Sequence, residues 1–147
     1  MKTEIKTFDE LTNIELYDLL RLRAEVFIVE QDCVYQDLDG RDQKAIHVLG
    51  KENQNLLAYA RVFKGGDYFE EASIGRIVVA QSGRSFGFGK EIVKASEKAI
   101  KEAYDETKIK LSAQSYLQNF YSEMGYKATG TEYLEDGIPH INMVKKL

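Results

Sequence analysis

The segment Arg84-Ser85-Phe86-Gly87-Phe88-Gly89 most constrains how this chain can fold, because it separates a β-like run from a helix-like run. Residues 73–80 before it are rich in β-branched side chains, as in a strand. Residues 90–104 after it carry apolar side chains at helical spacing. The glycines therefore lie where a helix begins, and the first N–H groups of a helix lack partners within it. Such a turn is a candidate phosphate cradle.

This turn differs from the two most familiar phosphate-binding motifs. It has no Gly-x-x-x-x-Gly-Lys-Ser/Thr sequence, and it lacks the third glycine of Gly-x-Gly-x-x-Gly. Phe86 and Phe88 stand where that second motif usually has small residues. Two glycines are equally typical of an ordinary turn, so a nucleotide-binding enzyme is a distant alternative.

The remaining sequence predicts an α/β fold with strands and helices in mixed order. Strands are expected at residues 3–8, 45–50, 56–63, 73–80, 107–113, 126–134 and 138–144. A capping box at Thr12–Glu15 should start a first helix that runs to about residue 29. A second helix is expected at residues 90–104, and a short third one carries Leu117, Phe120, Tyr121 and Met124 on one face. This order implies a mixed, mostly antiparallel sheet flanked by helices.

Length and composition favour one globular domain spanning residues 1–147. The net charge of −4 gives no electrostatic reason to expect nucleic acid, and no apolar run is long enough to span a membrane. The single cysteine, Cys33, cannot form an internal disulfide, which fits the reducing cytoplasm. The acids Asp37, Asp39 and Asp42 lack the spacing of a calcium-binding EF-hand, so a solvated loop and no metal site are expected.

Two motifs together resemble those of one enzyme family. Arg84-x-x-Gly87-x-Gly89, after the strand ending in Val78-Val79-Ala80, resembles the acetyl-CoA signature of the GCN5-related N-acetyltransferases, or GNAT family. Downstream, residues 120–126 resemble that family's helix ending in Tyr-x-x-x-Gly-Phe, with Tyr126 replacing the phenylalanine. Residues 21–39 and 135–140 further resemble the ElaA-like subgroup. The resemblance covers nearly the whole chain and implies two central strands that splay apart.

The resemblance also implies how acetyl-CoA would bind. Backbone N–H groups of the glycine turn would hold the pyrophosphate, and the preceding strand would pair with the pantetheine amides. Gln114 stands where many relatives carry an asparagine that contacts the cofactor. The expected cofactor contacts are Ile77, Val78, Val79, Arg84, Ser85, Phe86, Gly87, Phe88, Gly89, Lys90 and Gln114.

The implied reaction is direct attack of an acceptor amine on the thioester. Tyr121 stands where the family places its general acid. The general base is open, because residues 73–76 lack the glutamate found there in many relatives. His140, His47, Glu30 and a water relay are the alternatives, and His47 is more readily explained as a structural histidine.

The sequence thus predicts an N-acetyltransferase that moves an acetyl group from acetyl-CoA to a primary amine. The acceptor is not identified, although acids bordering the cleft would favour a cationic amine. A non-catalytic acyl-CoA-binding or interaction module is the alternative, since the strand glutamate is missing and Gln114 replaces an asparagine. One exposed strand edge would suffice for a homodimer.

Overall fold

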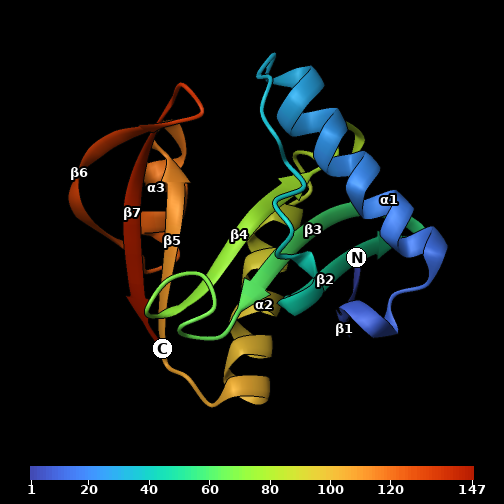
Figure 1. Ribbon diagram of the computed structural model, residues 1–147, viewed down its shortest axis with the longest axis horizontal. Helices are drawn as coiled ribbons and strands as arrows, with labels where there is room; N and C mark the ends of the chain where they lie inside the picture. Colours follow the sequence, from blue (N-terminus) through green and yellow to red (C-terminus); the bar gives the residue numbers. More distant parts are fainter.

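The computed structural model describes residues 1–147 and places all strands in one seven-stranded sheet (Figure 1). Its spatial order is β1-β2-β3-β4-β5-β7-β6. The strands are β1 (Lys2–Thr7), β2 (Ile46–Glu52), β3 (Asn55–Phe63), β4 (Ala72–Val79), β5 (Lys108–Gln114), β6 (Lys127–Glu135) and β7 (Ile138–Lys146). Only β4 and β5 run parallel. The predicted α/β class and the order of elements are confirmed.

Three α-helices accompany the sheet: α1 (Asn13–Arg23), α2 (Phe88–Tyr104) and α3 (Gln118–Glu123). Helix α1 starts at the predicted capping box, where Glu15 N donates to the Thr12 hydroxyl and Thr12 N donates to the Glu15 carboxylate. The helical path continues through Ala24–Glu30 in wider π-helical turns. It therefore ends close to the predicted position. Short 3₁₀ turns occur at Phe8–Glu10, Asp42–Lys44, Gln81–Gly83 and Ser115–Leu117.

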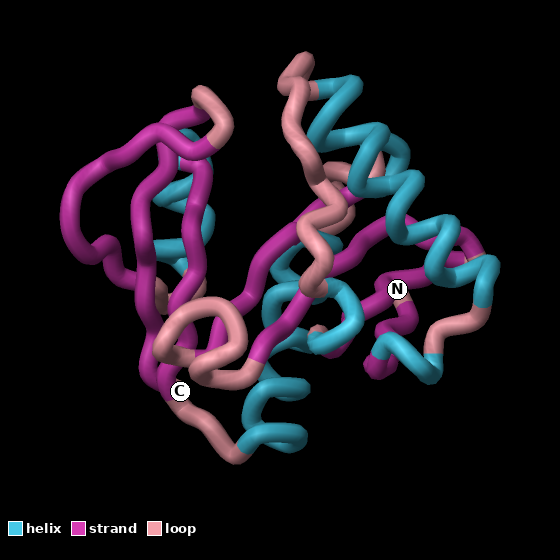
Figure 2. Tube along the Cα trace, viewed as in Figure 1, coloured by secondary structure: helices cyan, strands magenta, loops and turns pink.

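The helices cover opposite faces of the sheet, as Figure 2 shows. Strand side chains alternate between the two faces, so neighbouring residues of β2 enter different clusters. Val48 belongs to the larger apolar cluster with Ile92 and Ile100 of α2. Leu49 belongs to a smaller cluster with Leu19 of α1. The two clusters fix one helix on each face of the strands that lead to the glycine turn.

Strands β4 and β5 pair over only two residues and then separate. The paired positions are Ala72 with Ile109 and Ser73 with Lys110. Beyond them the strands diverge, and the sheet opens into the V shape seen in Figures 1 and 2. The pairing of β3 with β4 shifts between Tyr59 and Arg61, and Arg76 has a left-handed φ of 50° at this bulge. The expected splay of the central strands is confirmed.

The acidic loop, residues 36–42, differs from the sequence prediction. Asp37 and Asp42 are only 5% and 7% exposed, so the prediction of a solvated loop was wrong. Guanidinium groups from distant parts of the chain surround these carboxylates. The partners are Arg23 of α1, Arg61 of β3 and Arg76 of β4. Three positive charges thus match the three carboxylates.

The ion pairs of the acidic loop have short, directed hydrogen bonds. Arg23 donates from Nε to Asp37 at 2.8 Å and from Nη1 to Asp42 at 2.7 Å. Arg61 binds both carboxylate oxygens of Asp39 at 2.8 Å. Buried charges are tolerated only when they are paired and hydrogen-bonded in this way. The network therefore fastens the loop to the sheet.

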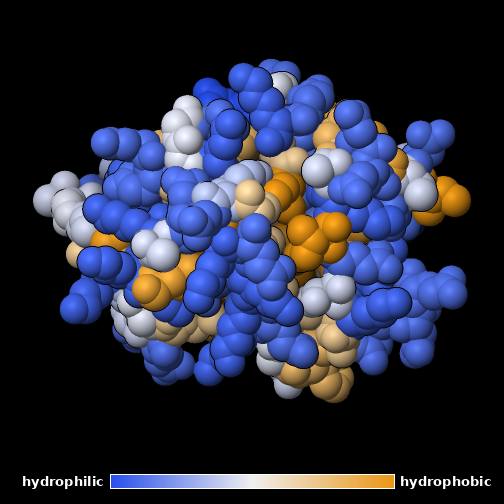
Figure 3. Space-filling model, turned by 90° about the horizontal axis from the view of Figure 1, so that it is seen from below, coloured by the Kyte–Doolittle hydropathy of each residue, from blue (hydrophilic) through white to orange (hydrophobic).

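Polar side chains dominate the face of the molecule shown in Figure 3, with apolar atoms gathered near its middle. None of the helices is long and apolar enough to cross a lipid bilayer.

Tyr126, which replaces the family's phenylalanine, is buried and donates its hydroxyl hydrogen to Glu97 at 2.8 Å. The Glu97 carboxylate also accepts hydrogen bonds from Lys145 Nζ at 3.2 and 3.0 Å. The hydroxyl that distinguishes Tyr126 from phenylalanine therefore has Glu97 as a defined partner.

The acidic loop should make the fold sensitive to acid. Burial alone would raise the pKa of Asp39. The hydrogen bonds and charge of Arg61, the Arg41 N–H and the charge of Arg76 together outweigh burial and lower that pKa from 3.8 to about 2. A depressed folded-state pKa stabilises the protein above about pH 4, and this contribution disappears as the pH falls toward 2. We expect Asp39→Asn to lower the free energy of unfolding at pH 7 by roughly 2 kcal/mol.

Thermal unfolding of this variant between pH 6 and pH 2 checks the prediction. The midpoint of Asp39→Asn should fall less steeply with acid than that of the wild type. Asp9→Asn, at an exposed position without an ion pair, is the control and should follow the wild-type curve. Parallel curves for Asp39→Asn and the wild type would contradict this role of Asp39.

Candidate active site

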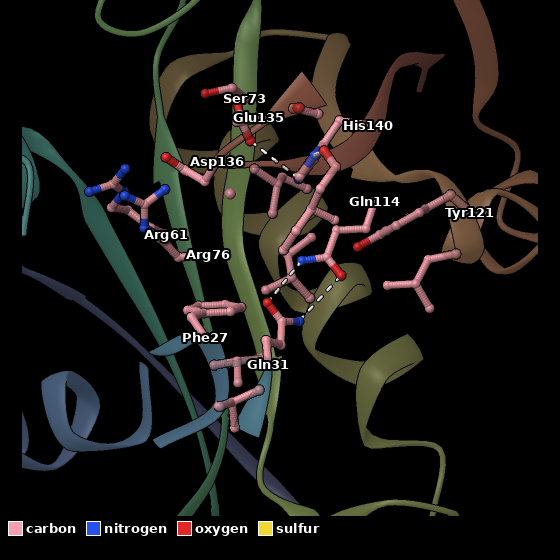
Figure 4. A pocket seen from close by; sticks show the side chains of 18 of the residues that line it. Phe27, Gln31, Arg61, Ser73, Arg76, Gln114, Tyr121, Glu135, Asp136 and His140 are labelled. Carbon is pink, nitrogen blue, oxygen red and sulfur yellow. Dashed lines mark hydrogen bonds and ion pairs between the residues drawn. The ribbon is translucent and has the colours of Figure 1, made fainter. Parts of the chain in front are cut away.

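A cleft of about 1170 Å³ lies where β4 and β5 diverge. Its walls come from the β4 and β5 backbones, the end of the α1 path, the short helix α3 and the turn between β6 and β7. Figure 4 shows side chains from these elements converging on one space. The cleft brings together residues that are more than a hundred positions apart in the sequence, such as Gln31 and His140.

The end of β4 presents to this cleft backbone groups that no neighbouring strand pairs with. Ala80 N donates to Leu57 O at 2.7 Å, and Ala58 lies opposite Val79. Hydrogen-bonded and non-hydrogen-bonded pairs alternate along an antiparallel ladder, so the N–H and C=O of Val79 point away from β3. They face the gap toward β5, where no strand pairs with them. This edge can receive an extended, amide-bearing ligand.

The glycine turn closes one end of the cleft. Ser85 and Gly87 have left-handed φ angles of 74° and 77°, and Gly87 immediately precedes α2. Left-handed residues in such turns aim successive N–H groups at one point, which suits an anion. The first N–H groups of α2 add to this site because they have no partner within the helix.

The cofactor residues predicted from the sequence divide between cleft and turn. Ile77, Val78, Val79, Arg84, Gly89 and Gln114 line the cleft. Ser85, Phe86 and Gly87 lie in the turn, and Phe88 and Lys90 lie at the start of α2. Phe86 is 67% exposed, and its ring stacks on that of Phe88 with 5.7 Å between centroids. A Cβ on Gly89 would lie 3.3 Å from the Phe120 ring, so a larger residue there would make that ring shift by a few tenths of an ångström.

Arg84 lies at an exposed position and binds across the mouth of the cleft. Its Nη1 and Nη2 atoms donate to the Glu30 carboxylate at 2.8 and 3.0 Å. Its Nε and Nη2 atoms donate to Val79 O at 3.2 and 3.1 Å. This side chain thus satisfies the carbonyl that an extended ligand would use.

Gln114 reaches the cleft, as predicted, and there it pairs with Gln31. The two amides exchange reciprocal hydrogen bonds of 3.3 Å, which Figure 4 draws as two dashed lines. Gln31 comes from the end of the α1 path and Gln114 from the end of β5. This amide pair joins the two arms of the V near the middle of the cleft.

Tyr121 lies on the cleft side of α3, and its hydroxyl points toward Gln114 in Figure 4. The side chain is only 5% exposed. Burial raises the pKa of Tyr121, so the hydroxyl stays protonated at neutral pH. Such a group can donate a proton to a charge that develops in the cleft.

His140 lies directly opposite Gln114 in the pairing of β5 with β7. Its Nδ1 contacts Ile138 O at 2.7 Å, and a carbonyl can only accept, so Nδ1 carries the hydrogen. The other ring nitrogen, Nε2, lies 3.3 Å from the Glu135 carboxylate. Nε2 is therefore the atom that can take up a proton, with Glu135 beside it to stabilise the charge.

His47 lies outside the cleft and has a structural role. It is fully buried, with Nε2 donating to Asp42 O at 2.9 Å and Nδ1 accepting from the Tyr59 hydroxyl at 2.6 Å. Burial lowers the pKa of His47, which favours the neutral ring. The structural interpretation of His47 is thus correct, and one of the alternative bases is removed from the site. Glu30 lines the cleft but is engaged by Arg84.

Sequence reasoning missed several residues that line the cleft. Glu135 entered only through the resemblance of residues 135–140, and Ser73 only through an expected strand that lacks the glutamate of many relatives. Arg61 and Arg76 gave no signal, since each is an isolated charge within a strand-like run. Alternation of side chains along the strand 138–144 could have predicted which face of the sheet His140 occupies. It could not have predicted that Glu135 lies beside His140.

The sequence was compared with models of known protein families. Residues 12–147 match the model described as an acetyltransferase (GNAT) domain. The chain belongs to the GNAT family. Protein ElaA of Escherichia coli is 40% identical over 140 residues, which cover 94% of this chain and 92% of ElaA. The resemblance to ElaA-like GNAT proteins is confirmed.

Solved structures confirm the GNAT fold. The crystal structure of E. coli ElaA has a TM-score of 0.91 and 36% identity, covering 99% of this chain and all of that one. An acyl-CoA N-acyltransferase from Pseudomonas aeruginosa has a TM-score of 0.91 and 37% identity, covering 99% of both chains. The PaiA N-acetyltransferase of Thermoplasma acidophilum, in complex with coenzyme A, shares the fold at 16% identity, a TM-score of 0.73 and full coverage of both chains.

The glycine turn offers a matched pair of variants. Gly87 and Gly66 have φ angles of 77° and 92°, and a Cβ on either would meet no atom within 4 Å. We expect Gly87→Ala and Gly66→Ala each to cost about 1 kcal/mol of stability, because both force alanine into a left-handed conformation. Only Gly87→Ala should also weaken coenzyme A binding, measured by calorimetry. Equal coenzyme A affinities would show that the turn does not hold the ligand.

Proposed function

We propose that this GNAT protein transfers an acetyl group from acetyl-CoA to a primary amine. One observation carries the proposal. A buried tyrosine hydroxyl, Tyr121, and a histidine whose Nε2 can accept a proton, His140, share one cleft with the β4 edge at Val79, which no strand pairs with. A proton donor, a proton acceptor and hydrogen-bond groups for an acyl carbonyl are the parts that acyl transfer to an amine requires.

The residues of the cleft fit acetyl-CoA from one end to the other. The N–H groups at the start of α2 would hold the pyrophosphate, and the free edge at Ile77 and Val79 would pair with the pantetheine amides. Gln114 would contact the cofactor once its amide is released from Gln31. The PaiA structure, solved with coenzyme A, supports this assignment through its common fold.

In the proposed reaction the amine nitrogen attacks the thioester carbonyl carbon and forms a C–N bond. The Val79 N–H stabilises the negative charge that develops on the carbonyl oxygen. His140 accepts a proton from the nitrogen at Nε2, and Glu135 stabilises the imidazolium that results. The C–S bond breaks, and Tyr121 donates its proton to the departing sulfur. No covalent acyl-enzyme is formed.

The free thiol Cys33 supports a location in the reducing cytoplasm. Residues 1–147 would act as one domain, because both arms of the V contribute to the same cleft. The exposed edge of β6 would be the place for a second copy in a homodimer.

A thiol-release assay tests the proposed activity. The purified protein is incubated with acetyl-CoA and a broad panel of primary amines, and free coenzyme A is measured. We expect release that depends on the amine and yields the N-acetyl product. Binding of acetyl-CoA by calorimetry without release for any amine would instead support a non-catalytic acyl-CoA-binding module.

Removing the Tyr121 hydroxyl tests the proposed general acid. Tyr121→Phe should keep coenzyme A affinity and lower kcat by roughly 100-fold, the usual contribution of a positioned acid. Tyr126→Phe is the control, since Tyr126 packs against Tyr121 at 6.0 Å but bonds Glu97 away from the cleft. Tyr126→Phe should be less stable than the wild type but should retain its kcat. Equal kcat values for the two variants would remove Tyr121 from the mechanism.

A further inference from the structure

The part of the cleft beyond His140 is long and changes in character along its length. His140 pairs with Gln114 of β5. Ser73 pairs with Lys110, which lies earlier on β5 than Gln114. From Lys110 to Gln114 the strand advances about 13 Å, at roughly 3.3 Å per residue. An acceptor held at His140 therefore has room to extend toward Ser73.

The His140 end of this space is acidic. Glu135 and Asp136 both line the cleft. Glu135 contacts only His140, at 3.3 Å, and the Asp136 carboxylate has neither an ion pair nor a side-chain hydrogen bond. By contrast, the arginines of the opposite wall are already matched by the acidic loop. The free negative charge at this end attracts the ammonium form of an amine and repels a carboxylate.

The far end offers hydrogen-bond donors that no protein group accepts from. Ser73 is 2% exposed and lines the cleft, and its Oγ has no partner. Arg61 Nε, on the neighbouring strand β3, likewise has none. Unpaired buried polar groups are rare in proteins and call for an explanation. An acceptor oxygen on a ligand would satisfy the Ser73 hydroxyl.

A free positive charge lies at the same end. Arg41 lines the cleft, and its guanidinium lies 5.1 Å from the centre of the Tyr68 ring without an ion pair. Tyr68 stacks on Phe63, which is paired with Ser73. Arg41 and Ser73 therefore belong to one corner of the cleft. A cation and hydroxyl donor together suit a carboxylate.

From this polarity we infer that the acceptor is an extended primary amine with a carboxylate at its opposite end. Its ammonium group lies near Glu135 and Asp136, where His140 can deprotonate it, and its carboxylate lies near Arg41 and Ser73. The inference rests on the proposed acetyl transfer for its catalytic meaning, but the binding it describes can be measured without turnover.

Three amines with the same six-carbon chain test the inference. 6-Aminohexanoate has its carboxylate at the far end, its isomer norleucine has it beside the amine, and hexylamine has none. We expect kcat/KM for 6-aminohexanoate to exceed that for hexylamine by roughly tenfold, the effect of one charge-assisted contact. Norleucine should be the poorest of the three. Equal values, or a preference for norleucine or hexylamine, would overturn the inference.

Variants at the two ends of the cleft have matched controls. Arg41→Gln should reduce the preference for 6-aminohexanoate over hexylamine, whereas Arg21→Gln, on the exposed surface of α1, should not. Asp136→Asn should raise KM for all three amines. Asp105→Asn is its control, because Asp105 and Asp136 have φ angles of 53° and 51° and only Asp136 lines the cleft.

Ser73→Ala separates a binding role from a structural one. Since Ser73 Oγ has no partner within the protein, its loss should leave the thermal midpoint unchanged and weaken 6-aminohexanoate binding. Calorimetry on the coenzyme A complex compares 6-aminohexanoate with hexylamine directly. Tighter binding of 6-aminohexanoate, lost in Arg41→Gln, supports the inference even if no amine releases coenzyme A. Equal binding of the two amines would refute it even if acetyl transfer is observed.

Discussion

The whole site depends on a ladder of hydrogen bonds that stops early. Strands β4 and β5 pair only at Ala72 and Ser73, and the two arms of the sheet diverge beyond that point. A parallel strand that loses its neighbour exposes backbone donors and acceptors, which must find other partners. At Val79 those groups face the cleft, so the interruption of the sheet is itself the binding surface.

The second wall of the cleft is held by charge. The acidic loop has little regular structure, and apolar contacts alone would fix it poorly. Arg23, Arg61 and Arg76 reach it from three elements, which gives the loop one position relative to the sheet. Since these charges compensate one another, the field inside the cleft is set by the few groups left over, Glu135, Asp136 and Arg41.

Local patterns predicted the strands, the helices and the glycine turn, because periodicity and capping act between near neighbours. The same patterns misjudged the acidic loop. Its partners lie between 14 and 39 residues away along the chain, and nothing near Asp37 signals that an arginine will reach it. Sequence reasoning brought Tyr121 and His140 forward through family resemblance. It could not join Glu135 to His140, since that contact forms only across a folded hairpin.

The position of Arg84 also bears on how the free protein avoids self-association. An open strand edge inside a splayed sheet is a template on which another extended chain can pair and aggregate. Arg84 covers the Val79 carbonyl, and the pair of glutamines closes the gap a little further along. The edge is thus masked by side chains whose hydrogen bonds a specific ligand can replace. A passing strand would have to displace the same contacts without the compensation that such a ligand provides.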